Sequence, residues 1–146
     1  MIDVIVADDS NLLRWTVCRI LENADGIEVI AEAGDGQVAL ELVERLAPDV
    51  LVLDVSMPDL NGVQICERLG ALGTRTGVVM FSGYAEEYVV REALRKGAKG
   101  YVLKGAFAMR ELVLAVRAVG RGESYLSSRV SHKALDEQVP SSVLSS

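Results

Sequence analysis

The sequence has few cysteines, no excess of basic residues and no long hydrophobic run. Cys18 and Cys66 form no Cys-x-x-Cys pair and lie in apolar-periodic stretches, which argues against a disulfide framework and indicates buried thiols in a reducing compartment. With 15 Lys and Arg against 21 Asp and Glu, the formal net charge is −6, so we expect no direct contact with a nucleic-acid backbone. Residues 1–9 lack a basic region and reach two acids after a short apolar run, unlike a signal peptide or a membrane span. We therefore expect a cytoplasmic protein that does not enter a membrane.

What the sequence does have is a series of strand-like segments. Half of its 146 residues are hydrophobic, which suffices for one substantial core, and the length favours a single domain. Five short apolar runs do not alternate with polar residues, as is typical of strands that are covered on both faces. These runs are residues 4–7, 29–31, 50–53, 78–81 and 101–103.

Segments with helical periodicity separate the apolar runs. Turn-forming residues such as Asp25-Gly26, Pro48 and Asn61-Gly62 fall between the periodic stretches. The alternation predicts an α/β fold of the doubly wound, flavodoxin-like (βα)5 class, with a parallel five-stranded sheet in the order 2-1-3-4-5 and helices on both faces. The helices are expected at about 11–24, 37–46, 62–72, 85–96 and 108–121.

The composition changes after residue 122. The last eight residues are rich in serine, carry no charge and show no strong period. We expect residues 1–122 to form the folded domain and residues 123–146 to begin a linker. Because the tail is too poor in apolar residues to build a second core, we expect that a following output domain is missing from this chain.

Three acids directly follow predicted strands. Asp8 and Asp9 come after the first apolar run, and Asp54 comes after the third. In a doubly wound sheet ligands bind at the C-terminal ends of the strands, so adjacent first and third strands would bring these carboxylates together. Carboxylates gathered in this way repel one another and need a cation, and a hard divalent ion with oxygen ligands fits Mg2+ best. The sequence therefore predicts a Mg2+ site.

Two further polar groups reach the same edge. Ser82 follows the fourth run and Lys104 follows the fifth. A carboxylate can attack phosphorus and form an acyl phosphate, while a cation, an ammonium group and hydroxyl or N–H donors neutralise charge on the phosphoryl oxygens. This set suits phosphoryl transfer to an aspartate.

These elements, in this order, resemble the receiver domain of two-component response regulators over about residues 2–121. Their joint occurrence is more specific than any one of them. The resemblance is carried by the acid pair after the first strand, Asp54-Val55-Ser56-Met57-Pro58-Asp59-Leu60-Asn61-Gly62 after the third, Ser82-Gly83 after the fourth and Lys104 after the fifth.

The resemblance implies roles for these residues. Asp54 would be the phosphoacceptor, Ser82, Gly83 and Lys104 would hold the phosphoryl oxygens, and Mg2+ would be bound by Asp8, Asp9, Asp54 and the backbone carbonyl of Ser56, with Asp9 favoured as the direct ligand. A sensor histidine kinase or a small acyl phosphate would be the donor. The domain would be a switch rather than an enzyme, in which phosphorylation changes a surface used for homodimerisation or for release of an output domain.

Residues 100–106 and 122–127 resemble the receivers that precede a LuxR-type helix-turn-helix domain, the NarL/FixJ-like subfamily. This implies a transcription regulator that contacts DNA only through the missing output domain. Many receivers have proline after the lysine, often with a cis peptide, whereas this chain has Gly105. Because a non-proline cis bond costs roughly 3 kcal/mol, the geometry of that loop is left open.

The site residues also have structural interpretations. Asp8, Asp9 and Ser10 can cap the helix that follows them, Ser82 can begin a turn, and a single lysine such as Lys104 is usually solvated. The shared strand edge is what favours the functional interpretation.

Three residues beside the predicted site carry weaker hypotheses. Tyr101 is either a core aromatic or, as the resemblance implies, a switch aromatic that turns inward when the strand-4 hydroxyl moves to the phosphoryl group. Ser56 and Tyr84, two residues after Asp54 and Ser82, are expected to flank the path of the hydrolytic water and to set the lifetime of the acyl phosphate.

The only tryptophan, Trp15, falls on the polar side of a helical wheel. The apolar face comprises residues 13, 17, 20, 21 and 24, which places Trp15 opposite, beside Asn11 and Cys18. Exposed indoles are enriched at interfaces, so Trp15, Asn11 and Cys18 are predicted to dock the phosphodonor kinase. Packing of Trp15 against the last helix or the linker is the alternative.

Two other functions share parts of this pattern. A flavodoxin-like module that binds FMN needs a phosphate-cradling loop after the first strand, where this chain has Asp8-Asp9. A phosphatase of the haloacid dehalogenase type needs an acid two residues after its nucleophile, where this chain has Ser56. Flavin absorbance or multiple turnover of a phosphatase substrate would support one of these.

Overall fold

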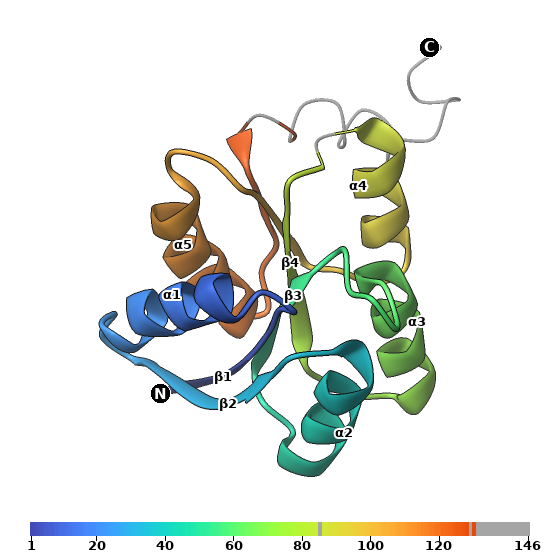
Figure 1. Ribbon diagram of the computed structural model, residues 1–146, viewed down its shortest axis with the longest axis horizontal. Helices are drawn as coiled ribbons and strands as arrows, with labels where there is room; N and C mark the ends of the chain where they lie inside the picture. Colours follow the sequence, from blue (N-terminus) through green and yellow to red (C-terminus); the bar gives the residue numbers. More distant parts are fainter. Residues whose placement is uncertain (85, 129, 131–146) are drawn as a thin grey trace.

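Strands and helices alternate along the chain in the computed structural model, which describes residues 1–84, 86–128 and 130 (Figure 1). The five predicted helices and the five predicted strands are all present, with ends within about two residues of those expected from the sequence. The strands are β1 (Ile2–Ala7), β2 (Ile27–Ala33), β3 (Val50–Asp54), β4 (Gly77–Ser82), β5 (Gly100–Leu103) and β6 (Tyr125–Leu126), and the helices are α1 (Asn11–Glu22), α2 (Gly36–Leu46), α3 (Gly62–Leu72), α4 (Glu87–Arg95) and α5 (Ala108–Gly120).

The strands form one parallel sheet in the order β2-β1-β3-β4-β5-β6. The order of the first five strands confirms the prediction. A short sixth strand that the sequence did not indicate adds two residues to the outer edge of β5. The Tyr125 N–H donates to the Lys99 carbonyl at 3.0 Å, and the Ser127 N–H donates to the Tyr101 carbonyl at 2.9 Å. A strand this short, within a Ser-rich stretch, leaves no apolar run for sequence reasoning to detect.

Helices cover both faces of the sheet. In Figure 1, α1 and α5 lie on one side of the sheet and α2, α3 and α4 lie on the other. Alternate residues of β1 point to opposite faces of the sheet. Val4 and Val6 pack with α1 and α5, whereas Ile5 and Ala7 pack with the other three helices. Two apolar faces explain why the strand runs do not alternate with polar residues.

Capping side chains start the helices that leave the C-terminal edge of the sheet. Ser10 caps α1 by accepting from the Leu13 N–H at 3.2 Å, and Asp35 caps α2 by accepting from the Val38 N–H at 2.8 Å. Asn61 and Gln64 form a reciprocal capping box at α3. The residues just before these helices are therefore held at the same edge as the predicted site.

The first residues of the expected linker pack onto the domain. Ser127 is 1% exposed, and its Oγ accepts from the Leu103 N–H at 2.9 Å and donates to Glu111 Oε1 at 3.1 Å. The Tyr125 hydroxyl donates to the other Glu111 oxygen at 3.1 Å. Residues 131–146 lie outside the described residues, so the linker there stays a prediction. Within the described ranges, no helix has the length and apolar character needed to cross a membrane.

Candidate functional site

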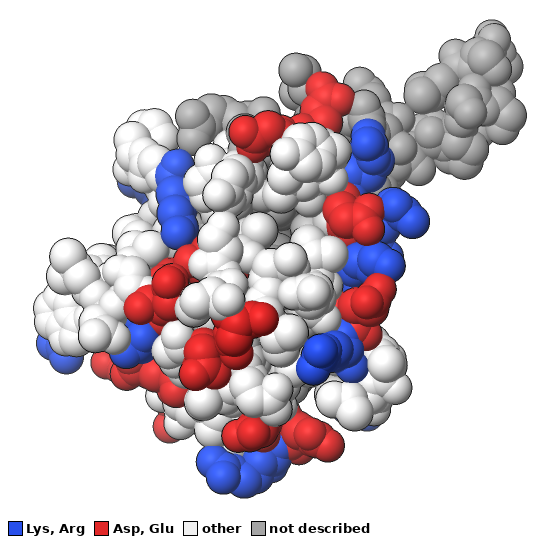
Figure 2. Space-filling view, turned by 45° about the vertical axis from the view of Figure 1, so that its right-hand side comes forward, with Lys and Arg blue, Asp and Glu red and all other residues white. Residues whose placement is uncertain are grey.

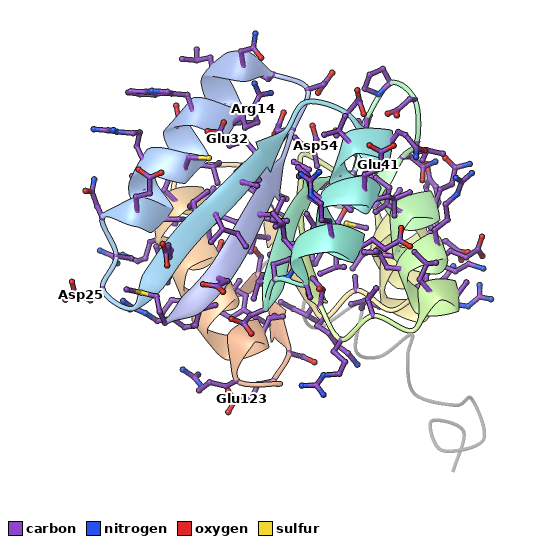
Figure 3. All side chains as sticks on the ribbon, turned by 90° about the horizontal axis from the view of Figure 1, so that it is seen from below. Arg14, Asp25, Glu32, Glu41, Asp54 and Glu123 are labelled. Atoms are coloured by element: carbon purple, nitrogen blue, oxygen red, sulfur yellow. The ribbon has the colours of Figure 1, made fainter. Side chains whose placement is uncertain are left out.

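Four strand ends bring polar residues to one edge of the sheet. Asp54 is the last residue of β3 and Ser82 the last of β4, while Asp8 and Lys104 directly follow β1 and β5. Asp54 and Asp8 are only 7% and 2% exposed, which is unusual for acids and indicates a specific role, and Ser82 is 1% exposed. Figure 3 shows Asp54 at the end of the sheet.

The three predicted acids form a cluster. Asp8, Asp9 and Asp54 each offer a carboxylate oxygen, and these oxygens lie within 4.8 Å of one another. Burial raises the pKa of Asp8 above its usual value, and the negative charge of Asp54 adds to this increase, while the Ser10 N–H and Lys104 oppose it. The grouped oxygens are ligands suited to a hard metal ion, whose charge would relieve this repulsion.

Lys104 supplies positive charge to the cluster. Its Nζ lies 3.7 Å from Asp54 Oδ2 and 5.4 Å from the centroid of the Phe81 ring. The backbone fixes this approach, because the Lys104 N–H donates to the Ser82 carbonyl at 2.8 Å across the ends of β4 and β5. The structure thus brings together the ammonium, the hydroxyl-bearing strand end and the central acid.

The capping alternative for the first acids applies to Ser10 alone. Its side chain caps α1, and its N–H donates to Asp8 Oδ1 at 2.9 Å. Asp9 is exposed and is not the residue that caps the helix. The carboxylates of Asp8 and Asp9 are therefore left to face Asp54.

The loop after β3 begins with a turn closed by the central acid. The Ser56 N–H donates to Asp54 Oδ1 at 3.0 Å, and the Gly62 N–H donates to the Val55 carbonyl at 2.8 Å. Ser56 is exposed, beside the acid cluster. Its carbonyl as a metal ligand stays a prediction.

Tyr101 points into the protein and ends on the loop after β4. The residue is 0% exposed, and its hydroxyl donates to the Tyr84 carbonyl at 2.7 Å. Burial raises the pKa of this phenol. The Tyr84 N–H in turn donates to Ser82 Oγ at 2.9 Å, whereas the Tyr84 side chain is exposed, as is Gly83. Tyr101 is thus a buried aromatic that is coupled through Tyr84 to the hydroxyl at the site, which leaves both interpretations of it open.

The glycine after Lys104 does not displace the lysine. None of the peptide bonds in the described part of the chain is cis, so the Lys104–Gly105 bond is trans. Lys104 nevertheless reaches Asp54, so the absence of proline leaves the ion pair intact.

The predicted docking residues on α1 separate into two groups. Trp15 is 60% exposed, with the Arg19 guanidinium 5.6 Å from its ring, and Asn11 is exposed. Including Cys18 was wrong: it is 3% exposed and packs between α1 and the sheet, and burial raises the pKa of its thiol to about 12. The apolar face of α1 is wider than the wheel suggested.

Sequence reasoning missed Arg14. Its Nη1 donates to the Asp8 carbonyl at 2.7 Å, its Nη2 to Asn11 Oδ1 at 2.7 Å and its Nε to Glu32 Oε1 at 3.2 Å (Figure 3). The arginine therefore holds the backbone of the acid pair from the side of β2. A basic residue in the first turn of the helix after two acids was the available signal.

The family model for the response regulator receiver domain matches residues 4–117. The transcriptional regulatory protein DegU of Brevibacillus brevis is 37% identical over 136 residues, which make up 93% of this chain and 57% of DegU. The response regulator UvrY of Escherichia coli K12 is 32% identical over 139 residues, or 95% of this chain and 63% of UvrY. This chain thus spans about three fifths of the length of these relatives.

Solved structures agree with the sequence match. The receiver domain of the response regulator NarL from Mycobacterium tuberculosis superposes with a TM-score of 0.80 at 36% identity, covering 84% of this chain and 98% of that one. A LuxR-family response regulator from Aurantimonas sp. SI85-9A1 superposes with a TM-score of 0.88 at 26% identity, covering 96% of this chain and 99% of that one. The family model, the related sequences and the solved structures agree, and the matched span includes all four strand ends of the site. The chain therefore belongs to the response regulator receiver domain family, and its relatives are regulators of the LuxR/NarL type.

Proposed function

We propose that this receiver accepts a phosphoryl group on Asp54 in the presence of Mg2+ and thereby switches an output. The observation that supports this most strongly is the meeting of Asp8, Asp9 and Asp54 within 4.8 Å, with Lys104 3.7 Å from Asp54. Asp9, Asp54 and the Ser56 carbonyl would bind the ion, with Asp8 beside them. Bound Mg2+ would neutralise the acids and the phosphoryl oxygens.

The chemistry assigned to the side chains is a displacement at phosphorus. A carboxylate oxygen of Asp54 forms the new O–P bond, while the bond from phosphorus to a histidine nitrogen, or to the acyl oxygen of a small donor, breaks and the leaving group keeps its electron pair. Lys104 then pairs with one phosphoryl oxygen, and the Ser82 hydroxyl and the Gly83 N–H donate to others.

The conformational response would start at Ser82. If its Oγ turns to the phosphoryl group, the hydrogen bond from Tyr84 is lost, and the loop that also accepts from Tyr101 is free to move. A two-state change of the β4–α4 loop and β5 would then alter a surface for homodimerisation or for release of an output domain.

A sensor histidine kinase is the proposed donor, and transcription the proposed output. DegU carries the name of a transcriptional regulatory protein, and this chain matches only 57% of it. The net charge of −6 supports DNA contact through a separate domain rather than through this one.

The central experiment is incubation with acetyl phosphate and Mg2+ followed by intact-mass measurement. Wild type should gain the mass of one phosphoryl group, and Asp54→Asn should gain none. Asp49→Asn, at the other end of the same strand, is the matched control and should behave as wild type. A phosphorylated Asp54→Asn, or an unmodified wild type, would overturn the proposal.

We further propose that Ser56 and Tyr84 set the lifetime of the acyl phosphate. Both side chains are exposed on the loops that leave β3 and β4, where water reaches Asp54. Ser56→Ala and Tyr84→Ala should change the dephosphorylation rate of the purified phosphoprotein. Rates equal to that of wild type in both variants would refute this role.

Kinase docking is proposed for Trp15 and Asn11. Trp15 stands 60% exposed on α1, whose N-terminus adjoins the acids. Trp15→Ala should slow phosphotransfer from the cognate kinase and leave the reaction with acetyl phosphate unchanged. Leu114→Ala, which removes an exposed apolar residue from α5, is the control. Equal transfer rates for the two variants would exclude docking through Trp15.

A further inference from the structure

Asp59 connects the loop after β3 to the start of α2. Both oxygens of its carboxylate are used: Oδ1 accepts from the Gly36 N–H at 2.8 Å, and Oδ2 accepts from the Gln37 N–H at 2.9 Å. These two donors, Gly36 first, lower the pKa of Asp59. A loop residue is thus attached to a helix that precedes it by more than twenty positions in the chain.

The loop and the helix are in close contact at this point. A Cβ atom added at Gly36 would lie 2.9 Å from the Cβ of Leu60 and 3.1 Å from its carbonyl oxygen, so only glycine permits the approach. On the other side of the loop, a Cβ atom at Gly62 would lie 3.0 Å from the Cα of Val55. The segment 55–62 is therefore confined between α2 and the end of β3.

This confinement bears on the metal site because Ser56 lies within the segment. Two hydrogen bonds fix the ends of the loop. At its beginning the Ser56 N–H donates to Asp54 Oδ1, and at its far end the Gly62 N–H donates to the Val55 carbonyl. Asp59 holds the part between these anchors. A backbone carbonyl has no rotamers, so the path of the loop alone decides where the Ser56 oxygen points.

We infer that Asp59 is a positioning residue for Mg2+, holding the 55–60 loop so that the Ser56 carbonyl faces Asp9 and Asp54. This inference rests on the proposed metal site. Mg2+ requires near-ideal octahedral geometry at about 2.0–2.1 Å, so a loop displaced by a fraction of an ångström loses a ligand. Residues that orient metal ligands typically affect affinity by about tenfold or more when removed.

The competing explanation is that Asp59 only caps α2. The structure offers a matched control, because Asp35 caps the same helix through the Val38 N–H at 2.8 Å but lies outside the loop. Asp35→Ala and Asp59→Ala each remove a carboxylate that accepts from N–H groups in the first turn of α2. Only the second also releases the loop.

The test is calorimetric titration of the unphosphorylated 146-residue protein with MgCl2. Asp59→Ala should raise the Kd for Mg2+ about tenfold, Asp59→Asn, which keeps one acceptor oxygen, should raise it less, and Asp35→Ala should match wild type. In phosphorylation with acetyl phosphate, Asp59→Ala should need more Mg2+ for half-maximal rate but reach the wild-type maximum at saturation.

The outcomes separate this inference from the proposal on which it rests. Wild-type binding with an unchanged Kd in Asp59→Ala, or equal weakening in Asp35→Ala, would overturn the positioning role alone. Absence of Mg2+ binding by wild type would overturn the metal site and the positioning role together.

Discussion

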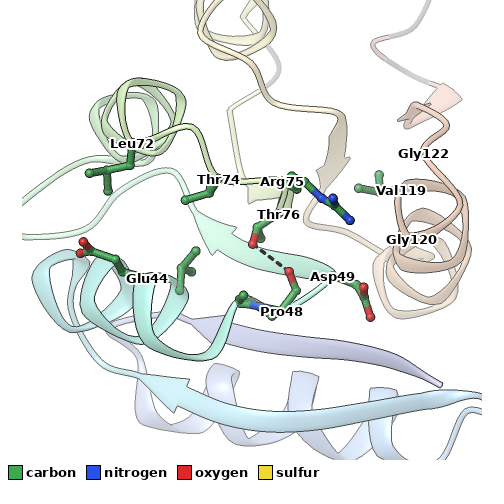
Figure 4. A pocket seen from close by; sticks show the side chains of 12 residues that line it. Glu44, Pro48, Asp49, Leu72, Thr74, Arg75, Thr76, Val119, Gly120 and Gly122 are labelled. Atoms are coloured by element: carbon green, nitrogen blue, oxygen red, sulfur yellow. Dashed lines mark hydrogen bonds between the residues drawn. The ribbon is translucent and has the colours of Figure 1, made fainter.

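At the C-terminal edge of the sheet, four strand ends bring carboxylates, a hydroxyl and an ammonium within reach of one another; at the N-terminal edge, the same sheet adjoins a hollow of about 630 Å³. Thr76, Pro48 and Gly120 line this hollow (Figure 4). One of its hydrogen bonds joins two neutral groups: Thr76 Oγ1 donates to the Pro48 carbonyl at 2.7 Å.

Ionisable residues at the hollow do not converge. Glu44, Asp49 and Arg75 come from α2 and from the segments before β3 and β4, and their charged ends point in different directions (Figure 4). The site edge, by contrast, holds Asp8 with a raised pKa against two other acids. A second hollow, of about 680 Å³, lies at the site edge and is lined by Asp9 and Ser56. The two hollows are of similar size, so it is the convergent charge that identifies the functional end of this fold.

Charge on the outer helices follows a third pattern. On the side that carries α3 and α4, basic and acidic side chains alternate over the surface (Figure 2). The ion pairs between Lys96 and Glu67 and between Arg95 and Glu92 belong to this pattern, at 2.6 Å and 2.8 Å. Exposed pairs of this kind contribute little to stability, and they do not concentrate charge as the site edge does.

The largest difference between the two edges should appear with the lysines that flank β5. Lys104→Ala removes the ammonium beside Asp54 and should slow phosphorylation by acetyl phosphate about a hundredfold, the typical cost of one donor to a developing anion. Lys99→Ala, just before the other end of β5, should react as wild type does. Quantification of phosphoprotein over time by intact mass checks this, and equal effects of the two variants would contradict the comparison.

A smaller effect is expected on stability at the acid cluster. Burial and the charge of Asp54 raise the pKa of Asp8, so the folded state holds this proton more tightly than the unfolded chain does. Stability of the metal-free protein is then lost as the pH rises from the ordinary pKa of aspartate through the raised one. Asp8→Asn should therefore increase the free energy of unfolding in EDTA at pH 7, by about 0.5–2 kcal/mol, the usual gain from a single stabilising substitution.

Urea denaturation of the Asp8→Asn variant in EDTA measures this gain. The gain should disappear below the ordinary pKa of aspartate, where the Asp8 carboxyl is neutral in both states. Asp49→Asn is the control from the opposite edge, where the exposed side chain accepts from the Asp3 N–H at 2.8 Å, and it should bring no gain. A less stable Asp8→Asn at pH 7 would mean that the cluster is not strained by its charges.

The smallest effect belongs to the hollow. Thr76→Val removes the hydrogen bond to Pro48 and should lower the free energy of unfolding by about 0.5–1 kcal/mol while leaving the phosphorylation rate unchanged. Thr76→Ser keeps the hydroxyl and should retain most of the stability. A reduced phosphorylation rate in Thr76→Val would show that the two edges are coupled.

The residues of the site were predictable because each stands directly after an apolar run. Asp54, Ser82 and Lys104 needed only the strand order to be brought together, and the parallel order follows from the alternation of strands and helices. The interpretation of Cys18 failed for a different reason. A helical wheel gives directions but not the width of the buried face, and α1 is covered by both the sheet and α5.

Other features depend on contacts between distant segments. The pairing of Tyr125–Leu126 with β5, and the hydrogen bonds of Ser127 and Tyr125 with Glu111, join residues separated by 14 or more positions. Neither segment shows a period or motif that names its partner. The sequence could therefore indicate only a change of composition after residue 122.

The meeting of Asp54 with Asp8, Ser82 and Lys104 at one edge was determined by the sequence itself, since strand ends are set by local hydrophobic pattern and parallel strands share one edge. Only the tertiary structure decided how Lys104 reaches Asp54 without a following proline, that Tyr101 bonds to the Tyr84 carbonyl, and that Asp59 holds α2. The reason is physical: these contacts depend on the positions of loops, which packing between elements sets and local propensity does not.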